Sequence, residues 1–459
     1  MKARALLISS GVALGSFVAS TQAHAAGTSL DIQSARGTGM ASAMVAHTDG
    51  ADSIFFNPAG IAQGKQLDVQ AGVSLVIPGY KYTDPNGSST RLPTAVAPPF
   101  QVYATGGITE NLSVGVGINL PYGLTLKWPD NWVGRSQIIK TSNINYNINP
   151  TVAYHLGPFR FGAGLQIVRS TVELVKAVQF PDQEGRTQLT AGSWGVGANV
   201  GAQLEAIPKY LNLGLHYRSR VKLDYDEGKA HFSNVPTSLQ GTFFDQNGST
   251  SITLPDTLSM GVASHPIDNL LVSFEADYYA WAVFKSIDIA FPQTPALNQS
   301  EAKNFHNRFN YHLGGEYTIN ENFKVRAGAM YDPSPSPPST LGPDVPDSNR
   351  VNLAAGVGYK HQCGFYGDLG YQHIFLLSKT SSYAPLPGSY GGSVEVIGIT
   401  LGFKFDYSGK AKTAPPPDAG PPPEMTPPPG DLPAGSTPPP PVEPAPNPAP
   451  DSANPSPMN

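Results

Sequence analysis

The stretch that decides the fold is LSVGVGINL, from Leu112 to Leu120. Its even positions are all large aliphatic residues, whereas its odd positions are serine, glycine and asparagine. A period of two indicates a β-strand, because successive side chains of a strand point to opposite faces. One face is apolar and the other offers only small or polar groups, which is typical of a barrel wall with lipid outside. We therefore expect the bilayer to surround this strand.

The same alternation recurs from Gln66 onward and predicts about fourteen strands within residues 66–407. No internal boundary divides this region, so we predict an all-β fold, one transmembrane antiparallel β-barrel. Tight turns alternate with longer connections, which we place at 83–96, 121–135, 233–249, 291–302, 334–347 and 382–391. Bacterial outer-membrane barrels have short periplasmic turns and longer outer loops. An even strand count then places both termini in the periplasm of a Gram-negative outer membrane.

The two ends of the chain do not belong to the barrel. Residues 1–25 combine two early basic residues, an apolar run and an A-x-A motif, which predicts a secretory signal peptide. A membrane anchor is the alternative, but the apolar run is shorter than the roughly 20 residues that a span needs. Residues 408–459 are rich in proline and predict an extended periplasmic tail. The tail suits a periplasmic partner or peptidoglycan, and an inert spacer remains an equal alternative.

Composition argues against several functions. The net charge of −5 gives no case for nucleic acid, and the single Cys363 allows no internal disulfide. Ten histidines are scattered without the spacing of a catalytic triad, a zinc helix or a Cys/His cluster. We therefore predict no catalytic residue, no metal, no cofactor and no enzyme activity. Membrane-embedded hydrolases use a few side chains on strand rims, so the sequence leaves that alternative open.

Residues 26–65 precede the first strand and do not alternate. They are rich in glycine, alanine and serine and contain Asn57, Pro58 and Ala59. Small residues with a few aromatics suit a compact plug, or hatch, inside a barrel lumen. Asparagine before proline also suits a tight turn, because the proline ring restricts the preceding backbone.

The third strand is followed by a predicted defect in the wall. Proline and glycine interrupt a strand ladder, and Pro121 and Gly123 follow the regular stretch directly. The irregular sequence continues through Trp132 to Gly134. Trp132 and its neighbour Trp128 are expected in an outer loop, either to capture hydrophobic molecules or as part of the interfacial aromatic girdle.

The fifth strand, residues 159–179, predicts the lining of the lumen. Alternation places Val168, Val172, Leu174 and Lys176 on its inward face. An apolar pocket that ends at a cation suits an acyl chain with a carboxylate head group. The alternative is that Lys176 is a solvated rim charge paired with Glu173.

A second candidate cation for the ligand pocket is Arg326, which also faces inward by parity. Its alternative is an ion pair with an acidic residue of the plug, such as Asp49 or Asp52.

The sequence resembles the FadL-type outer-membrane transporters of long-chain fatty acids and aromatic hydrocarbons. The resemblance rests on the Asn57-Pro58-Ala59 motif, on PYGL at 121–124, on NWVGR at 131–135 and on the strand count, and it covers residues 26–407. It implies an N-terminal hatch, an inner ligand pocket, and a kink in the third strand that opens the wall sideways. Lys176 aligns with a basic residue that contacts the ligand head group in family members.

The resemblance implies passive uptake of hydrophobic molecules, with outer-membrane lipid and lipopolysaccharide as surroundings. Two rivals remain: a structural or adhesive barrel that transports nothing, and a general diffusion porin, against which the hatch argues. Fatty acids and toluene-like ligands require the same apolar lining, so the sequence does not separate them. The loop near residues 180–188 is shorter than the helical loop that forms the outer capture groove in the family, and the proline tail lies outside the family pattern.

Overall fold

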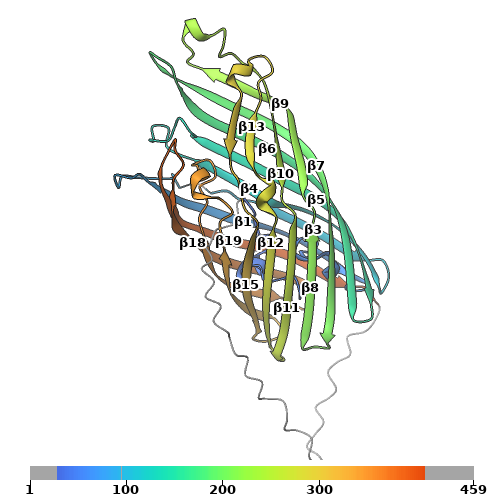
Figure 1. The fold of residues 1–459 in the computed structure, drawn as a ribbon. Helices are drawn as coiled ribbons and strands as arrows, with labels where there is room; N and C mark the ends of the chain where they lie inside the picture. The colour runs from blue at the N-terminus through green and yellow to red at the C-terminus, as the bar shows by residue number, and fades with distance from the viewer. Residues whose placement is uncertain (1–27, 95, 409–459) are drawn as a thin grey trace, which may run out of the picture. The chain divides into compact units, whose positions relative to one another are not determined.

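A computed structural model describes residues 28–94 and 96–408 of the chain. The predicted signal peptide and residues 409–459 of the tail lie outside the described residues. The wall is one closed antiparallel barrel (Figure 1). It closes because β19 (Gly388–Asp406) returns to pair with β1 (Gln66–Thr83) along its whole length, which removes the free edges of the sheet.

The remaining wall strands follow in chain order: β3 (Phe100–Gly107), β4 (Leu112–Lys127), β5 (Lys140–Leu156), β6 (Phe159–Gln179), β7 (Glu184–Ile207), β8 (Leu211–Arg218), β9 (Val221–Ser233), β10 (Gln246–Leu254), β11 (Thr257–Ile267), β12 (Leu270–Tyr279), β15 (Arg308–Thr318), β16 (Phe323–Asp332), β17 (Arg350–Lys360) and β18 (Phe365–Ser381). β8 and β9 continue one another across a short break, as do β10 and β11. Each pair counts as one wall strand. The described barrel therefore has fourteen strands, which confirms the predicted fold class.

The other elements are short: β2 (Ser89–Arg91), β13 (Ser286–Ile289), β14 (Gln299–Ala302), α1 (Ala35–Gly39), α2 (Ser53–Phe56), and the 3-10 turns η1 (Pro58–Ile61), η2 (Thr237–Leu239), η3 (Trp281–Val283), η4 (Pro295–Leu297) and η5 (Pro338–Thr340). Within residues 28–94 and 96–408, no helix has the length and apolar character needed to cross a membrane.

The alternating side chains face as the sequence predicts. On β4, the outward side chains of Val114 and Val116 are 41% and 45% exposed, whereas the inward side chain of Ser113 is 1% exposed. Similar outward rows of aliphatic and aromatic residues recur on the other wall strands. The apolar face of the wall therefore points away from the barrel axis.

Several predicted loop boundaries differ from the structure, most of all the connection expected at 291–302, which spans residues 280–307 between β12 and β15. The connection expected at 121–135 begins later, because β4 continues to Lys127, and the one expected at 382–391 is shorter, because β19 begins at Gly388. The predicted loop at 334–347 is an irregular connection as expected, but most of it is buried and only Pro338 and Ser339 in it are exposed. β6 and β7 are joined by only four residues, 180–183.

Residues 28–64, the N-terminal segment, pack against the inward faces of strands around the barrel (Figure 1). Met40 and Met44 are completely buried. Glycines of the wall permit the close approach: a Cβ on Gly201 would lie 2.0 Å from Oδ1 of Asn57. Glu275 on β12 accepts the backbone N–H groups of Met44 and Val45 at 2.7 and 2.8 Å. The segment is thus bonded to the wall by polar contacts as well as packing.

Candidate functional site: a gap in the barrel wall

The wall is incomplete between β3 and β4. The two strands pair only from Gly107 opposite Ser113 to Val102 opposite Ile118. Beyond Ile118, β4 continues for nine residues without β3 beside it. On its other side, the register of β4 with β5 shifts between Asn119 and Tyr122, which marks a β-bulge.

The bulge reverses which residues of β4 face inward. Leu120 was expected to face lipid with the other even positions, and this prediction is wrong: Leu120 is 6% exposed. Two residues of β4 oppose one residue of β5 at the bulge, so the period slips by one position. As a result Tyr122 and Leu126 are buried, whereas Thr125 faces outward. The extra residue turns the upper half of β4 into an apolar inner wall.

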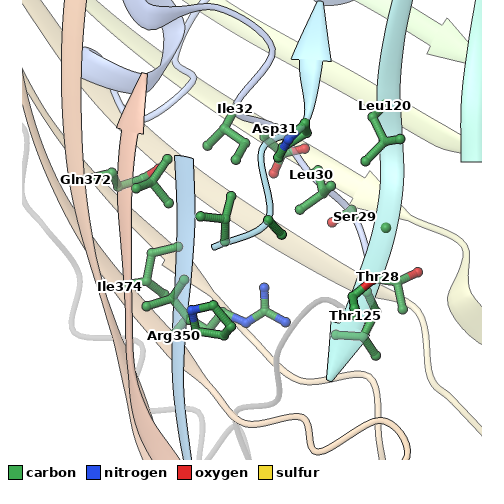
Figure 2. A pocket seen from close by; sticks show the side chains of 18 of the residues that line it. Thr28, Ser29, Leu30, Asp31, Ile32, Leu120, Thr125, Arg350, Gln372 and Ile374 are labelled. Atoms are coloured by element: carbon green, nitrogen blue, oxygen red, sulfur yellow. The ribbon is translucent and has the colours of Figure 1, made fainter. Parts of the chain in front are cut away.

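The N-terminal segment bonds to the free edge of β4. The amide of Leu30 donates to the carbonyl of Pro121 at 2.9 Å, and the amide of Gly123 donates to the carbonyl of Thr28 at 2.9 Å. Ser29 and Tyr122 form the antiparallel bridge between these two bonds. Figure 2 shows Ser29 and Leu30 beside the strand that carries Leu120. Pro121 and Gly123 therefore lie where the N-terminal segment bonds to β4, beside the bulge.

An apolar cavity of about 230 Å³ adjoins this junction. Its apolar lining comes from the N-terminal segment, β1, β4, β18 and β19, and includes Leu30, Ile32, Leu120, Leu124, Ile374 and Val396 (Figure 2). The lining also includes Ile144 and Tyr146, which lie on the outward face of β5, alternating with buried asparagines. The cavity thus reaches from the lumen through the gap to the outer side of the wall.

Arg350 is the cation of this cavity (Figure 2). Its guanidinium lies 3.2 Å from the carboxylate of Asp347 and 3.7 Å from that of Asp332. Asp31 of the N-terminal segment also lines the cavity and accepts a hydrogen bond from the Tyr279 hydroxyl at 2.9 Å. Burial raises the pKa of Asp31. A mainly apolar space therefore contains one cation, Arg350, together with the carboxyl groups of Asp31 and Asp332.

A second apolar cavity, of about 60 Å³, lies farther toward the long loops. Val172 and Leu174 line it, together with the aromatic rings of Trp281, Phe284 and Phe305. Val168 is 1% exposed and belongs to the same apolar cluster. Thr28 and Leu124 line both cavities, so the two spaces meet at these residues.

Lys176 lies outside both cavities. It faces a separate space near Phe232, Phe243 and Phe291, and its Nζ donates to Oε1 of Gln299 at 2.6 Å. Its expected alternative partner, Glu173, instead pairs with Lys140 at 2.6 Å.

The structure also separates Arg326 from the apolar cavities. Its guanidinium bonds to Glu316 at 2.7 Å and to Asp368 at 2.6 Å, both on the barrel wall. Arg36 of the N-terminal segment lies 3.4 Å from the same Glu316 carboxylate. Asp49 pairs with Arg36 at 2.6 Å, so the acidic residue of the plug has a partner other than Arg326.

Trp132 belongs to an aromatic and aliphatic cluster that also includes Leu126 of β4 and Ile32 of the N-terminal segment, and Gly134 contacts its ring. Trp132 is 3% exposed and stacks on Trp128 with ring centroids 4.5 Å apart. A Cβ on Gly134 would lie 2.3 Å from the Trp132 ring. The indole N–H of Trp128 donates to the carbonyl of Pro343 at 3.1 Å, in the buried loop 333–349.

That loop closes the outer end of the site. Lys303 is 1% exposed and pairs with Asp344 of the loop at 2.6 Å and with Glu301 at 2.7 Å. Burial disfavours its charge, but the two carboxylates outweigh this effect and raise the pKa of Lys303. Asp344 lines the second cavity, whereas Arg350, just after the loop, lines the first.

The hatch motif holds a tight turn against the wall. Asn57 precedes Pro58 with an extended backbone, and its Oδ1 accepts the amide of Ala59 at 3.1 Å. Its Nδ2 donates to carbonyls of Val45 and Ala202 at 2.9 and 3.0 Å. One side chain thus joins two parts of the N-terminal segment to β7.

Comparison with known proteins now decides the family. The family model described as "Outer membrane protein transport protein (OMPP1/FadL/TodX)" matches residues 16–408. The chain belongs to this FadL family. A long-chain fatty acid transport protein from Escherichia coli is 26% identical over 88% of this chain and all of that protein. Outer membrane protein P1 of Haemophilus influenzae is 23% identical over 64% of this chain and 70% of that protein.

Solved structures share the FadL-family fold. A Pseudomonas aeruginosa FadL homologue has a TM-score of 0.70 at 17% identity, covering 83% of this chain and all of that chain. The toluene transporter TodX of Pseudomonas putida has a TM-score of 0.64 at 15% identity, covering 80% and 98%. The resemblance inferred from the sequence is confirmed, and as a FadL-family member the protein resides in the outer membrane.

Sequence reasoning missed two parts of this FadL-family site. Arg350 shares the parity of the inward-facing Asn352, so the alternation of β17 could have placed it inside. The backbone bonds of Thr28 and Leu30 to β4 had no sequence signal, because carbonyl and amide groups are the same in every residue.

Proposed function

We propose that this protein takes up hydrophobic molecules, long-chain fatty acids or similar compounds, and releases them sideways into the outer membrane near β4 without catalysis. One observation carries the proposal: a single apolar cavity has a lining from inside the barrel and from the outward face of β5. A general porin would instead need a polar bore along the barrel axis. Fatty acid and toluene, the substrates that name its relatives, both fit an apolar lining.

The physical reason for a sideways exit is the cost of wetting an alkyl chain. Moving a chain from an apolar cavity into periplasmic water costs about 0.8 kcal/mol for each methylene exposed. Release through the gap between β3 and β4 transfers the chain from protein to lipid and avoids that cost. No energy source is then needed for passage down a concentration gradient.

The proposed route passes through the two cavities in turn. The cavity of about 60 Å³ is the outer one, and the cavity of about 230 Å³ beside the gap is the inner one. A ligand enters the outer cavity at Val172 and Leu174, near Val168, and Lys176 at the rim attracts carboxylates. It then passes between Thr28 and Leu124 into the inner cavity, where Arg350 holds the head group. Arg326, bonded on both sides, helps to hold the hatch instead of the ligand.

Residues 26–65 act as the hatch in this proposal, with Asn57, Pro58 and Ala59 as its fixed end. Its movable end is Thr28 to Leu30, whose two hydrogen bonds to β4 cover the gap. Both chain ends lie in the periplasm, which follows from the even strand count. Outer-leaflet lipid and lipopolysaccharide surround the wall, and the tail is available for peptidoglycan or a periplasmic partner.

The test is a reversible lock of the movable end. Ser29 and Tyr122 face each other between two backbone hydrogen bonds, an antiparallel position whose Cα atoms lie about 4.5 Å apart and suit a disulfide. We expect Ser29→Cys with Tyr122→Cys, in a Cys363→Ser background, to lose at least about nine-tenths of radiolabelled oleate uptake when oxidised. Reduction should restore uptake to the level of the reduced double variant.

The two single cysteine variants control for the loss of either side chain. Both should respond to oxidant and reductant no more than the Cys363→Ser parent. Full oleate uptake by the oxidised double variant, with the disulfide verified by mass spectrometry, would show that the gap is not the exit.

A further inference from the structure

Four outward-facing residues form a row beside the wall gap: Phe100 of β3, Tyr146 of β5, Arg169 of β6 and Trp194 of β7. The register pairs Tyr146 with Arg169, and Arg169 with Trp194. The rings of Phe100 and Tyr146 lie 5.5 Å apart. Tyr146 also lines the inner cavity, so the row borders the proposed exit.

The row marks the upper limit of the lipid-facing band. Below it on β6 the outward residues are apolar, including Phe161 and Leu165 at 47% and 45% exposed. Above it, Glu173 pairs with Lys140 on the same outward face. From Phe159 to Arg169 is about 33 Å of strand, which gives roughly 25 Å of height at the usual barrel tilt. Arg169 therefore lies at head-group depth, at the end of the barrel with the longer loops.

Two contacts hold the side chain of Arg169 in place, but it has no carboxylate partner among the ion pairs of the described residues. Its guanidinium lies 5.4 Å from the Trp194 ring centroid, and Nη1 donates to the carbonyl of Ser193 at 3.2 Å. Gly192 leaves room for it, because a Cβ there would lie 2.6 Å from Nη2. The stacking and the backbone bond orient the charged group along the wall.

The neighbouring outward cations differ in this respect. Lys140 pairs with Glu173 at 2.6 Å, Lys222 with Asp224 at 2.9 Å, and Arg220 with Asp256 at 2.7 Å. Their charges are already compensated by the protein. Within residues 28–94 and 96–408, the half-buried charge of Arg169 is compensated by an aromatic face and a carbonyl dipole but by no carboxylate, so an anion from the surroundings would gain most there.

We propose that Arg169, Trp194 and Tyr146 bind the phosphate of an outer-leaflet glycolipid on the outside of the barrel, next to the gap. A guanidinium can donate two parallel hydrogen bonds to a phosphate, and Trp and Tyr favour the membrane interface. The sugar backbone would lie against the two rings, and the acyl chains would lie over the apolar band below. The site shares Tyr146 with the border of the inner cavity, but Arg169 and Trp194 lie outside that cavity, so binding of the lipid phosphate does not depend on the transported ligand.

Native mass spectrometry of the purified barrel tests the site, with diphosphorylated lipid A as the probe. We expect Arg169→Gln to raise the dissociation constant of the lipid about tenfold or more, because it removes a charge-assisted contact. Lys222→Gln is the matched control: it removes an outward cation at the same end and should bind like the wild type. Lipid A without phosphates should bind the wild type as weakly as diphosphorylated lipid A binds Arg169→Gln.

Three results would overturn the proposal: equal binding by Arg169→Gln and Lys222→Gln, equal binding of phosphate-free lipid A, or equal Arg169-dependent binding of phosphatidylglycerol. The last result would identify a general anionic-lipid site. Arg169 faces lipid and bonds to no buried side chain, so the variant should fold, and heat-modifiable migration on gels checks this. Arg169→Lys offers a second variant, which retains the charge and should bind between the wild type and Arg169→Gln.

Discussion

At the residue scale, two cations compete for the role of head-group ligand. Arg350 faces the inner cavity beside the wall gap, whereas Lys176 lies near the outer rim and bonds to Gln299. Both could attract a carboxylate, but only Arg350 has an apolar cavity of about 230 Å³ next to it that continues into the gap. The position of the cation relative to that cavity decides which one holds a bound fatty acid.

We predict that Arg350→Gln weakens oleate binding about tenfold or more and leaves toluene binding within about twofold of wild type. A hydrogen bond to a charged group contributes roughly 1.5–3 kcal/mol, and toluene has no group that uses it. Binding to the purified barrel can be measured by calorimetry for both ligands. Lys176→Gln is the comparison variant and should retain oleate affinity. The reverse result, with affinity lost only in Lys176→Gln, would assign the head group to the outer rim.

Asp52 is a buried carboxyl group of the N-terminal segment, and it makes the stability of the folded protein depend on pH. Asp52 is 3% exposed, accepts a hydrogen bond from Ser34 Oγ at 2.7 Å, and lies outside the wall strands. Burial is the main cause that raises its pKa to about 6 from an ordinary value of 3.8. A raised carboxyl pKa means that the folded state favours the protonated form. The stabilising effect of protonated Asp52 on the folded state is complete below about pH 4 and is lost as the pH rises through about 6.

We therefore predict that Asp52→Asn stabilises the protein at neutral pH but not in acid. The difference in free energy of unfolding between variant and wild type should be near zero at pH 4 and approach roughly 3 kcal/mol at pH 7. Urea unfolding in lipid vesicles at several pH values measures it, and comparison at each pH cancels changes in the rest of the barrel. A difference that does not vary with pH would show that folding leaves the pKa of Asp52 unshifted.

At the element scale, the wall was predictable because each strand has one lipid face and one inner face. The bilayer imposes the period of two on every strand, and β6 matches the predicted residues 159–179. The same rule failed at Leu120, because a one-residue bulge reverses the parity and the sequence shows only that proline and glycine are nearby. Whether a position is odd or even predicts which side of the wall its side chain faces, until a bulge shifts the register. Such bulges occur where a site needs a break in the wall.

The burial of the loop 333–349 could not be predicted from the sequence, for another reason. Its proline and serine content is typical of a surface loop, and we expected a long outer connection at 334–347. Its burial depends on partners distant in sequence: Lys303 bonds to Asp344, and Ser381 Oγ donates to the carbonyl of Leu341 at 2.7 Å. Such contacts follow from barrel closure, which brings β14, β16 and β18 together at one end. Local composition therefore identified a loop but not that the loop packs into the barrel.

At the scale of the whole molecule, the barrel and its contents are held by different forces. The wall is a closed ladder of backbone hydrogen bonds, which lipid strengthens because unpaired groups have no water to bond. The N-terminal segment contributes one bridge to that ladder, at Ser29 and Tyr122, and otherwise relies on packing and side-chain bonds. The segment should therefore move or be removed at a smaller cost than any wall strand.

We predict that a barrel lacking residues 28–62 still folds and conducts ions in planar bilayers, whereas the wild type does not. The closed ladder begins at Gln66 and keeps its β1 to β19 closure without the segment. Removing completely buried residues such as Met40 and Met44 leaves a space bordered by polar groups of the wall, including Asn147 and Gln203, which water can enter. Heat-modifiable migration verifies folding, and single-channel recording measures conductance. A folded but non-conducting deletion variant would mean that the loop 333–349 alone seals the bore, and the hatch would then serve the side exit only.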